Sequence, residues 1–457
     1  MATARPSLIR VPLDVPPESL ARLIGAMPEP ALLESGRGFG AAGRWSILAA
    51  CPSLTFEATG LDWSIQQSGQ VVESGRGETL AAIETLLSRE RLADPSEIPD
   101  PDLPPFQGGL IGFLGYDLAP QLERLPRKAP RDTRMPDARL GLYDTFVAVD
   151  HALGRAELFA TKGELAVWQA RLAEPPADVA RSRLGPISGN FTEEEYRAAV
   201  SQALEYIAAG DIFQVNLSQR FEAAGEPVPL DLYLRLKERS PAPFGAFLQW
   251  GDLAVVSASP EWFYQTRGDR IVTRPIKGTR RRGLTPREDE ALAGVLALSA
   301  KDRAELTMIV DLERNDLGRV CRYGSVRVID PHAIESYAQV HHLVATIEGR
   351  ARPEIGPTEI VRAMFPGGSI TGAPKIRAMQ IIDELEPTRR GLYTGAIGYF
   401  SRGGASAFNI AIRTMLVEGD RVTYQVGGGI VADSEPQSEY HETLHKGRGL
   451  REVIEDL

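Results

Sequence analysis

The most informative segment of the chain reads Thr273-Arg274-Pro275-Ile276-Lys277-Gly278-Thr279-Arg280-Arg281-Arg282. Residues 270–273 predict a short strand, and Pro275 should end its ladder because proline has no N–H to donate. Gly278 permits a tight turn. Lys277 is therefore expected at a rigid corner between strand and turn, where its side chain is aimed. A lysine in a basic loop is ordinarily solvated, so a functional role depends on the residues that the rest of the chain places beside it.

The composition is that of an ordinary soluble globular protein, with 457 residues, 43% of them hydrophobic and 25% charged. This length predicts two or three domains. The net charge of −10 argues against general nucleic-acid binding, which needs a basic face. No apolar run approaches the roughly 20 residues of a membrane helix, and the first ten residues contain no hydrophobic signal core. The two cysteines, Cys51 and Cys321, are too few for a disulfide framework, which favours a reduced cytoplasmic location.

Changes in composition divide the chain into three parts. Residues 1–172 form an N-terminal region, residues 173–190 are a linker rich in Pro, Gly and Ser, and residues 191–457 form a second region. Residues 92–105 contain five prolines and four acids and predict an extended surface connection. Residues 106–117 space glycines through an apolar run without a following Gly-Lys-Ser/Thr, which favours a strand over a phosphate-binding loop.

The second region opens with a helix and a strand that the sequence marks clearly. Thr192 and Glu195 form a capping box at the start of the helix. The run from Ile212 to Ser218 then alternates apolar and polar residues, which predicts a half-buried strand. Its two expected faces are Phe213, Val215 and Leu217 on one side and Gln214, Asn216 and Ser218 on the other.

Two pairs of carboxylates are spaced three residues apart on predicted helices. Asp302 and Glu305 belong to a helical region over residues 285–317, and Glu439 and Glu442 lie near the start of the last helix. This spacing places both carboxylates of a pair on one helix face. Paired carboxylates suit a hard divalent cation, and magnesium needs only one or two of them besides substrate and water. A single pair of this kind is more often a solvated helix face.

Other segments offer proton transfer and anion binding. Glu261 follows Ser257-Ala-Ser-Pro260, and a carboxyl group in a closed site can have its pKa raised enough to donate a proton. The glycine-rich segment 365–375 precedes a predicted helix, whose free N–H groups would bind a carboxylate, with Ser369 adding a hydroxyl. Arg413 offers a planar fork that pairs bidentately with a carboxylate. Each signal is weak alone.

Together these segments resemble the chorismate-utilising enzymes. Pro275-Ile276-Lys277-Gly278-Thr279 resembles the signature of that family, and the form with lysine is similar to aminodeoxychorismate synthase component I. The related anthranilate synthase component I typically carries alanine at this place. The resemblance runs from Leu32-Leu33-Glu34-Ser35 to the last helix and is densest over residues 190–450. It implies an α/β (α+β) fold like that of anthranilate synthase component I, with two intertwined halves of mostly antiparallel sheets packed with helices around a central cleft.

The resemblance also implies roles for the reactive groups. Lys277 matches the nucleophile towards C2 of chorismate, and Glu261 matches the general acid/base. Glu305 and Glu442 match the ligands of Mg²⁺, the expected cofactor, with Asp302 and Glu439 in or near its coordination shell.

A further set of residues matches the substrate-binding positions of the family. Tyr393 and Arg413 match its clamp on the pyruvyl carboxylate. Gln214 stands where the isochorismate and salicylate synthases have a lysine that activates water, so delivery of water to C2 is disfavoured here. The remaining expected substrate-binding residues are Gly427, Gly428, Gly429, Ser369, His342, Thr279 and Lys446. Leu33, Glu34 and Ser35 match the sequence element that, in members of the family, contributes to a tryptophan pocket. A packed strand end is the plainer interpretation of these residues.

The function implied is magnesium-dependent conversion of chorismate and ammonia into 4-amino-4-deoxychorismate, on the route to p-aminobenzoate and folate, through a covalent Lys277 adduct. The sequence contains no Gly-x-Cys-x-Gly nucleophile element, so ammonia is expected from a glutamine amidotransferase subunit, and no fused lyase domain is expected before Leu457. Two alternatives stay open: anthranilate synthase component I in tryptophan biosynthesis, and a catalytically inactive subunit that only binds chorismate.

Overall fold

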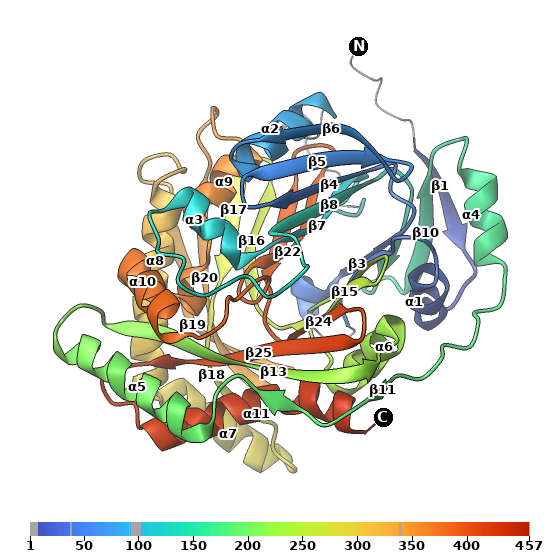
Figure 1. Ribbon diagram of the computed structural model, residues 1–457. Coiled ribbons are helices and arrows are strands. Elements are labelled where there is room, and N and C mark those ends of the chain that lie inside the picture. Colours follow the sequence, from blue (N-terminus) through green and yellow to red (C-terminus); the bar gives the residue numbers. More distant parts are fainter. Residues whose placement is uncertain (1–7, 37–38, 91, 93–101, 338–339, 457) are drawn as a thin grey trace.

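The computed structural model describes residues 8–36, 39–90, 92, 102–337 and 340–456. These residues form two large sheets, one of 13 strands and one of 12, with helices packed on their outer faces (Figure 1). The pairings within the sheets are antiparallel, as between β13 and β25 in the first and between β7 and β8 in the second. The expected fold of mostly antiparallel sheets packed with helices is confirmed.

The first sheet is ordered β1-β10-β9-β3-β2-β14-β15-β24-β25-β13-β11, with β12 and β21 also paired to β13. Its strands are β1 (Ile9–Leu13), β2 (Ala31–Glu34), β3 (Trp45–Ala49), β9 (Phe146–Asp150), β10 (Arg155–Ala160), β11 (Arg183–Leu184), β12 (Ser188–Gly189), β13 (Gln214–Glu226), β14 (Phe244–Trp250), β15 (Leu253–Ser259), β21 (Gly372–Ala373), β24 (Thr414–Glu418) and β25 (Arg421–Ile430).

The second sheet is ordered β18-β20-β17-β16-β23-β22-β7-β8-β4-β5-β6, with β19 also paired to β20. Its strands are β4 (Leu54–Thr59), β5 (Asp62–Gln67), β6 (Gln70–Arg76), β7 (Gly109–Leu114), β8 (Ala138–Tyr143), β16 (Trp262–Arg267), β17 (Arg270–Arg274), β18 (Ile276–Arg281), β19 (Arg327–Ser336), β20 (Val340–Arg350), β22 (Ala396–Ser401) and β23 (Ser406–Ile410).

Each sheet combines strands from both ends of the chain and joins them at one seam. In the first sheet the N-terminal strands end at β2, which pairs with β14 of the second region. In the second sheet they end at β7, which pairs with β22. The halves are therefore intertwined, as expected. The predicted linker, residues 173–190, adds β11 and β12 to the edge of β13, and the division into regions at that point stays a prediction.

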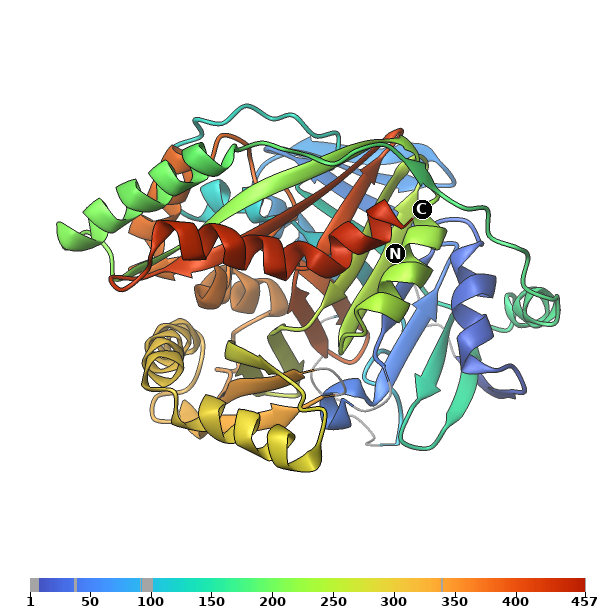
Figure 2. The ribbon, with the colours of Figure 1, turned by 90° about the horizontal axis from the view of Figure 1, so that it is seen from below.

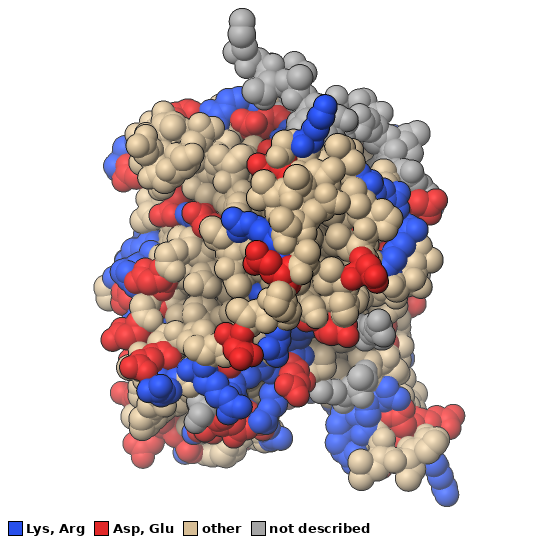
Figure 3. Space-filling model, turned by 90° about the vertical axis from the view of Figure 1, so that its right-hand side faces the viewer, with Lys and Arg blue, Asp and Glu red and all other residues tan. Residues whose placement is uncertain are grey.

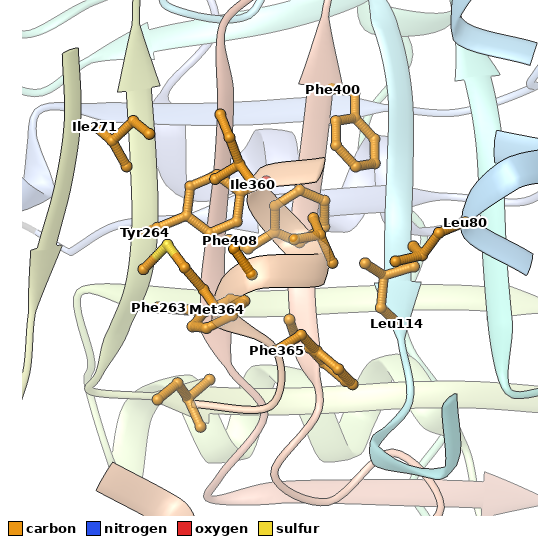
Figure 4. Close-up of a cluster of buried hydrophobic side chains, with 14 of the residues drawn as sticks. Leu80, Leu114, Phe263, Tyr264, Ile271, Ile360, Met364, Phe365, Phe400 and Phe408 are labelled. Atoms are coloured by element: carbon orange, nitrogen blue, oxygen red, sulfur yellow. The ribbon is translucent and has the colours of Figure 1, made fainter. Parts of the chain in front are cut away.

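Helices cover the outer faces, and the three largest of the five clusters of buried apolar side chains in the described residues form layers. The helices are α1 (Pro17–Gly25), α2 (Thr79–Arg89), α3 (Ala119–Leu122), α4 (Leu165–Leu172), α5 (Glu193–Ala208), α6 (Pro229–Arg239), α7 (Pro286–Leu298), α8 (Ala300–Gly318), α9 (Pro357–Met364), α10 (Lys375–Leu385) and α11 (Pro436–Glu455). One layer lies between α1, α4, α6, α11 and the first sheet, and one lies between the two sheets. The third packs α2, α8 and α9 against the second sheet, where Figure 4 shows Met364 and Phe365 beside Phe263 and Tyr264.

The segment around Lys277 differs from the prediction in one respect. Pro275 does separate two strands, but β17 and β18 both pair with β20, so the chain continues along the same neighbour. Gly278, with φ +73°, is not a turn. It sits in a bulge, where the register with β20 shifts between Lys277 and Thr279. The predicted turn was wrong because a positive φ serves a bulge as well as a turn.

The strand from 212 to 218 was wrongly predicted to be half-buried. Val215 and Leu217 are buried, but so are Gln214 and Ser218 on the other face, while Phe213 is 71% exposed and lies outside β13. The polar face of β13 is covered as well, because the N–H and hydroxyl of Ser218 donate to the buried Glu386 carboxylate and Asn216 lines a cavity beside Gly427. Of the predicted surface connection over 92–105, residues 93–101 lie outside the described residues.

The surface carries both signs of charge. On the face in Figure 3, basic and acidic side chains are intermixed. Among the described residues, none of the helices has the length and apolar character needed to cross a membrane.

Candidate active site

A cavity of about 540 Å³ opens between α8 and α11. Figure 2 shows these helices on opposite sides, with α11 and α5 along one and α7 and α8 along the other. Strands β18, β20 and β25 contribute to its walls, together with the short 3₁₀ turn Gly368–Ile370. With two exceptions, Gln214 and Gly428, the predicted catalytic, metal and substrate-binding residues line this one cavity.

Lys277 projects into the cavity from β18. The bulge at Gly278 fixes its direction, and its Nζ lies 3.5 Å from the Ser369 carbonyl oxygen, to which it donates. Burial lowers the pKa of Lys277, although the carboxylates of Glu305 and Glu261 oppose this shift. A lysine whose protonated form is disfavoured is closer to the neutral amine that a nucleophile requires.

Glu261 lies between β15 and β16 and is 6% exposed. Its backbone carbonyl accepts from the Ile410 N–H and its own N–H donates to Ser259 Oγ, so the backbone around it is held on both sides. Burial raises the pKa of Glu261, against the opposing effects of the Ser369 hydroxyl and of Lys277. Its Oε1 makes no hydrogen bond of normal geometry within the described residues. A buried carboxyl with a free oxygen suits proton donation to a bound substrate.

The two predicted carboxylate pairs face the same cavity from opposite helices. Asp302 and Glu305 come from α8, and Glu439 and Glu442 come from α11. Burial raises the pKa of Glu305 and of Glu439, and the neighbouring carboxylates raise both further. The pKa of Glu442 is lowered because the ammonium group of Lys446, 2.7 Å away, outweighs the effect of burial.

These carboxylates fit a cation that also takes ligands from substrate and water. Among the described residues, no three acidic, histidine or cysteine side chains converge closely enough to hold a metal ion by themselves. Asp302 is paired with Arg280, and Glu439 accepts from the Ser434 hydroxyl. Like charges facing one another across a cavity repel, and a divalent cation between them would relieve that repulsion. Magnesium, which keeps several waters, suits this sparse set of ligands.

Tyr393 and Arg413 both line the cavity, and the Tyr393 hydroxyl lies next to Gly427 of β25. A Cβ on Gly427 would lie 2.9 Å from the Tyr393 hydroxyl and 2.7 Å from Asn216 Oδ1, so glycine keeps this space open. Arg413 has a φ of +50°, an uncommon conformation for arginine. A hydroxyl, a guanidinium and exposed backbone in one place suit a carboxylate.

The other predicted substrate-binding residues complete the wall. Ser369 is 4% exposed and its Oγ has no hydrogen-bond partner in the described part of the chain. His342 Nδ1 lies 2.9 Å from Thr279 Oγ1, and burial lowers the pKa of His342 to about 4, so the imidazole is neutral at pH 7. Lys446 donates to the Gly427 carbonyl oxygen at 3.1 Å.

The expected anion site at a helix N-terminus is placed differently. Ser369 belongs to the 3₁₀ turn, while the first residue of α10, Lys375, turns away and pairs with Asp316. The 3₁₀ turn, and not α10, therefore contributes Ser369 to the cavity wall. Gln214 and Gly428 lie behind the wall: a Cβ on Gly429 would be 2.8 Å from Gln214 Nε2, and one on Gly428 would meet Glu439 at 3.2 Å. Gln214 is fully buried, with both amide atoms unpartnered among the described residues.

A buried ion pair that the sequence did not indicate supports this wall. Arg390 and Glu386, both buried, are joined at 2.7 Å. Arg390 also donates to the carbonyl oxygens of Asn216 and Ile370, and its guanidinium lies 5.6 Å from the ring centroid of Tyr393. Charged residues in sequence normally indicate surface, so only the tertiary structure reveals this support.

Leu33, Glu34 and Ser35 line a second, smaller cavity of about 130 Å³. Its other lining residues include the aromatic side chains Trp45, Phe244, Trp262, Tyr399 and Phe408. The Glu34 carboxylate accepts from the Tyr233 hydroxyl and from Lys237, and Ser35 Oγ donates to the Pro243 carbonyl oxygen. The cavity therefore has aromatic walls and a polar end.

Comparison with known proteins agrees with this geometry. The family model for chorismate binding enzymes matches residues 40–452. An aminodeoxychorismate synthase component 1 from Bacillus subtilis (strain 168) is 38% identical over 471 residues, covering 100% of this chain and 98% of that protein.

A second relative carries the name of the sister enzyme. An anthranilate synthase component 1 from Cereibacter sphaeroides is 37% identical over 470 residues, covering 97% of this chain and 93% of that protein. The crystal structure of anthranilate synthase component I from Streptococcus pneumoniae TIGR4 superposes with a TM-score of 0.78 at 32% identity, covering 89% of this chain and 92% of that one. The matched length, the shared fold and the cavity leave one conclusion about ancestry: this chain belongs to the family of chorismate binding enzymes.

Proposed function

We propose that this protein is an aminodeoxychorismate synthase component I, which converts chorismate and ammonia into 4-amino-4-deoxychorismate for p-aminobenzoate and folate synthesis. The observation that carries the proposal is the placement of the Lys277 amine. The amine lies inside the cavity and has a lowered pKa, and Glu261, Tyr393 and Arg413 line the same cavity. A lysine in free solution has a pKa of about 10.4 and is a poor nucleophile at pH 7.

The residues divide the reaction into two displacements. Tyr393 and Arg413 hold the pyruvyl carboxylate of chorismate. Neutral Lys277 forms a bond to C2 while Glu261 gives its proton to the C4 hydroxyl, which leaves as water as the ring double bonds shift. Ammonia then bonds to C4 and gives one proton back to Glu261, while the C2–nitrogen bond breaks, so that Lys277 recovers its electron pair. Pyruvate stays attached throughout, and a separate lyase would remove it.

Magnesium is the proposed cofactor, and its ligands would come from both sides of the cavity. Glu305 on α8 and Glu442 on α11 are the direct candidates, with Asp302 and Glu439 beside them. When bound, the ion would neutralise the ring carboxylate of chorismate and draw charge towards it. Lys446, which already contacts Glu442, is placed to approach the same carboxylate.

The competing function is anthranilate synthesis, in which pyruvate is eliminated. It is favoured by the nearly equal identity to relatives of both names, 38% and 37%. Lysine at position 277, where the sister enzymes typically carry alanine, speaks against it. Chorismate, magnesium chloride and ammonium chloride should yield a product that retains the pyruvyl group, identified by mass, and no anthranilate fluorescence. Fluorescence at full turnover would favour the sister function.

The nucleophile itself can be trapped. Chorismate without ammonia, quenched in acid, should add the mass of chorismate minus water to the intact protein, on the peptide that contains Lys277. Lys277→Met should lose the adduct and lower product formation by about a thousandfold. Lys128→Met, which removes an exposed lysine far along the chain, serves as the control. Undiminished turnover in Lys277→Met would refute the nucleophilic role, and absence of any chorismate turnover in the unmodified protein would favour the inactive binding subunit.

The ammonia is proposed to come from a glutamine amidotransferase subunit in a heterodimer. If so, the protein alone should use ammonium salts but not glutamine, and adding that subunit should make glutamine effective. Glutamine use by the isolated chain would contradict this.

The smaller cavity is proposed to hold an aromatic amino acid, with tryptophan as the first choice. The aromatic rings would pack the indole, and the polar end, where Glu34 and Ser35 lie, would receive the amino acid group. Isothermal titration with tryptophan should show binding that Ser35→Trp, which fills the cavity, abolishes. Equal binding by both proteins would exclude this cavity.

A further inference from the structure

Glu313 is a buried carboxyl that the proposed reaction does not use. It lies on α8, two turns beyond Glu305, and is 5% exposed. Its Oε2 is 2.7 Å from the Thr273 hydroxyl oxygen, which in turn lies 2.8 Å from the Phe263 carbonyl oxygen. Thr273 is itself fully buried. The three groups form a short hydrogen-bonded chain beneath the floor of the active site.

The hydrogen-bonded series from Glu313 through Thr273 to Phe263 has one proton too few if Glu313 is ionised. A hydroxyl has a single proton to donate, while a carbonyl and a carboxylate only accept. With an ionised Glu313, Thr273 satisfies either Phe263 or Glu313 but not both. With a neutral Glu313, the acid donates to Thr273 and Thr273 donates to Phe263, so both hydrogen bonds are made. In a buried place an unmade hydrogen bond is costly, so the neutral acid fits the geometry.

The carbonyl at the end of the chain belongs to a bulge. Phe263 and Tyr264 of β16 lie opposite the single residue Thr273 of β17, because the register shifts between Trp262 and Gln265. Phe263 is also skipped by the neighbouring strand β23. Its carbonyl accepts a hydrogen bond from the Thr273 side chain. Bulges redirect the strand that contains them, and this one begins two residues after Glu261.

The charges around Glu313 disfavour its ionisation. The groups that act on it are Glu261 and Asp316, both acidic, and Lys375. Lys375 is already paired with Asp316 at 2.5 Å and donates to the Met364 carbonyl oxygen. Burial raises the pKa of Glu313 to about 8; Glu261 and Asp316 add to this effect, while the hydrogen bond with Thr273 and the charge of Lys375 oppose it. The group is therefore mostly neutral at pH 7 and titrates just above it.

We propose that Glu313 is a positioning residue that works as a neutral acid: its proton completes the chain through Thr273 to Phe263 and locks the bulge that aims Glu261, and its ionisation unlocks that bulge and reduces chorismate turnover. Thr273 also lies four residues before Lys277 on the same run of chain, so one hydrogen-bonded chain steadies both reactive groups. The inference rests on the proposed function only in needing chorismate as the substrate, and not on which product forms.

The test is the pH profile of chorismate consumption, with ammonium salt and magnesium present. The unmodified enzyme should lose turnover above pH 8, to about a tenth one pH unit beyond the midpoint. Glu313→Gln donates to Thr273 without being able to ionise, so it should stay within about twofold of the unmodified enzyme at pH 7 and keep its turnover at pH 9. Asp311→Asn, an exposed carboxyl on the same helix, is the matched control and should keep the unmodified profile. An unchanged alkaline loss in Glu313→Gln would overturn the proposal.

A second variant and a spectroscopic signal separate positioning from mere stability. Glu313→Leu removes the donor at every pH and should lower kcat about tenfold at pH 7 with little change in KM, whereas undiminished kcat would count against the proposal. Infrared difference spectra between pH 6 and pH 9 should show protonated-carboxyl bands from Glu313 and from Asp117, whose pKa burial raises to about 7, and Glu313→Gln should lose one of these components while keeping the other. This signal needs no turnover, so it tests the neutral acid even if the product assay contradicts the proposed function, and an undiminished band in Glu313→Gln would overturn the proposal.

Discussion

Because Glu313 is buried, its protonation makes the stability of the folded protein depend on pH. An unfolded glutamate has a pKa of about 4.3, while the folded value is about 8. Between these values the folded protein keeps a proton that the unfolded chain has lost, so the free energy of unfolding falls as pH rises, by up to roughly 1.4 kcal/mol per pH unit. Below pH 4 Glu313 is protonated in both the folded and the unfolded state, so its burial no longer lowers the free energy of unfolding.

Glu313→Gln should therefore stabilise the protein at alkaline pH relative to the unmodified chain. The difference in melting temperature between the two proteins is expected to be small at pH 5 and to grow towards pH 8, because glutamine has no proton to lose. Thermal melts at several pH values measure this difference directly. A difference that stays constant with pH would mean that Glu313 is ionised in the folded state.

At the scale of single residues, the sequence predicted most of the side chains that line the cavity, because the motifs that contain them are local. Lys277, Glu261 and the two carboxylate pairs could be named from their neighbours along the chain, and they line one cavity. Gln214 could not be placed correctly, because its depth behind Gly429 depends on how β13 and β25 pair. Glu313 gave no signal at all, since a glutamate in a helix is ordinarily solvated.

At the scale of elements, the bulge in β18 places Lys277 beside α8. A Cβ on Gly278 would lie 2.8 Å from the Asp302 carboxyl carbon, and its φ of +73° disfavours any side chain. Close packing and backbone conformation therefore both require glycine at this position. The sequence indicated that position 278 needs glycine, but it did not indicate whether the residue lies in a turn or in a bulge. The bulge arises from the register shift between β18 and β20, which local sequence does not specify.

Gly278→Ala should lower chorismate turnover by at least about tenfold and destabilise the fold by about 1–3 kcal/mol. Gly268→Ala is the matched control: it also has a positive φ, +57°, in the turn between β16 and β17, but no atom lies within 4 Å of its added Cβ. Comparing denaturation midpoints and turnover of the two variants separates backbone strain from contact with Asp302. Equal turnover in both would show that the packing of Gly278 does not matter for the site.

At the scale of the whole molecule, the active site is closed by helices from distant parts of the chain. The carboxylates of α8 and α11 face each other across the cavity, more than a hundred residues apart in sequence. The resemblance predicted the intertwined fold, whereas periodicity alone gave only helices and strands, because strand order is not written in local patterns.

Magnesium together with chorismate should raise the melting temperature by linking these two helices, since a ligand that binds only the folded state stabilises it. Chelation with EDTA should remove this rise and lower turnover by about a hundredfold, with recovery on adding magnesium. Glu305→Gln should lose the rise, while Glu452→Gln, an exposed residue of α11, should keep it. Full turnover in EDTA would exclude the cofactor.

The two seams, β2 with β14 and β7 with β22, also constrain how the protein is made on the ribosome. Strand β2 pairs with the nearby β3 on one edge, but its other edge must wait more than 200 residues for β14, and β7 waits for β22 until residues 396–401 have been synthesised. During that interval the nascent chain exposes two strand edges with apolar side chains, which invite association with other chains. Translation speed and chaperone supply should therefore govern the yield of this protein more than its final stability does.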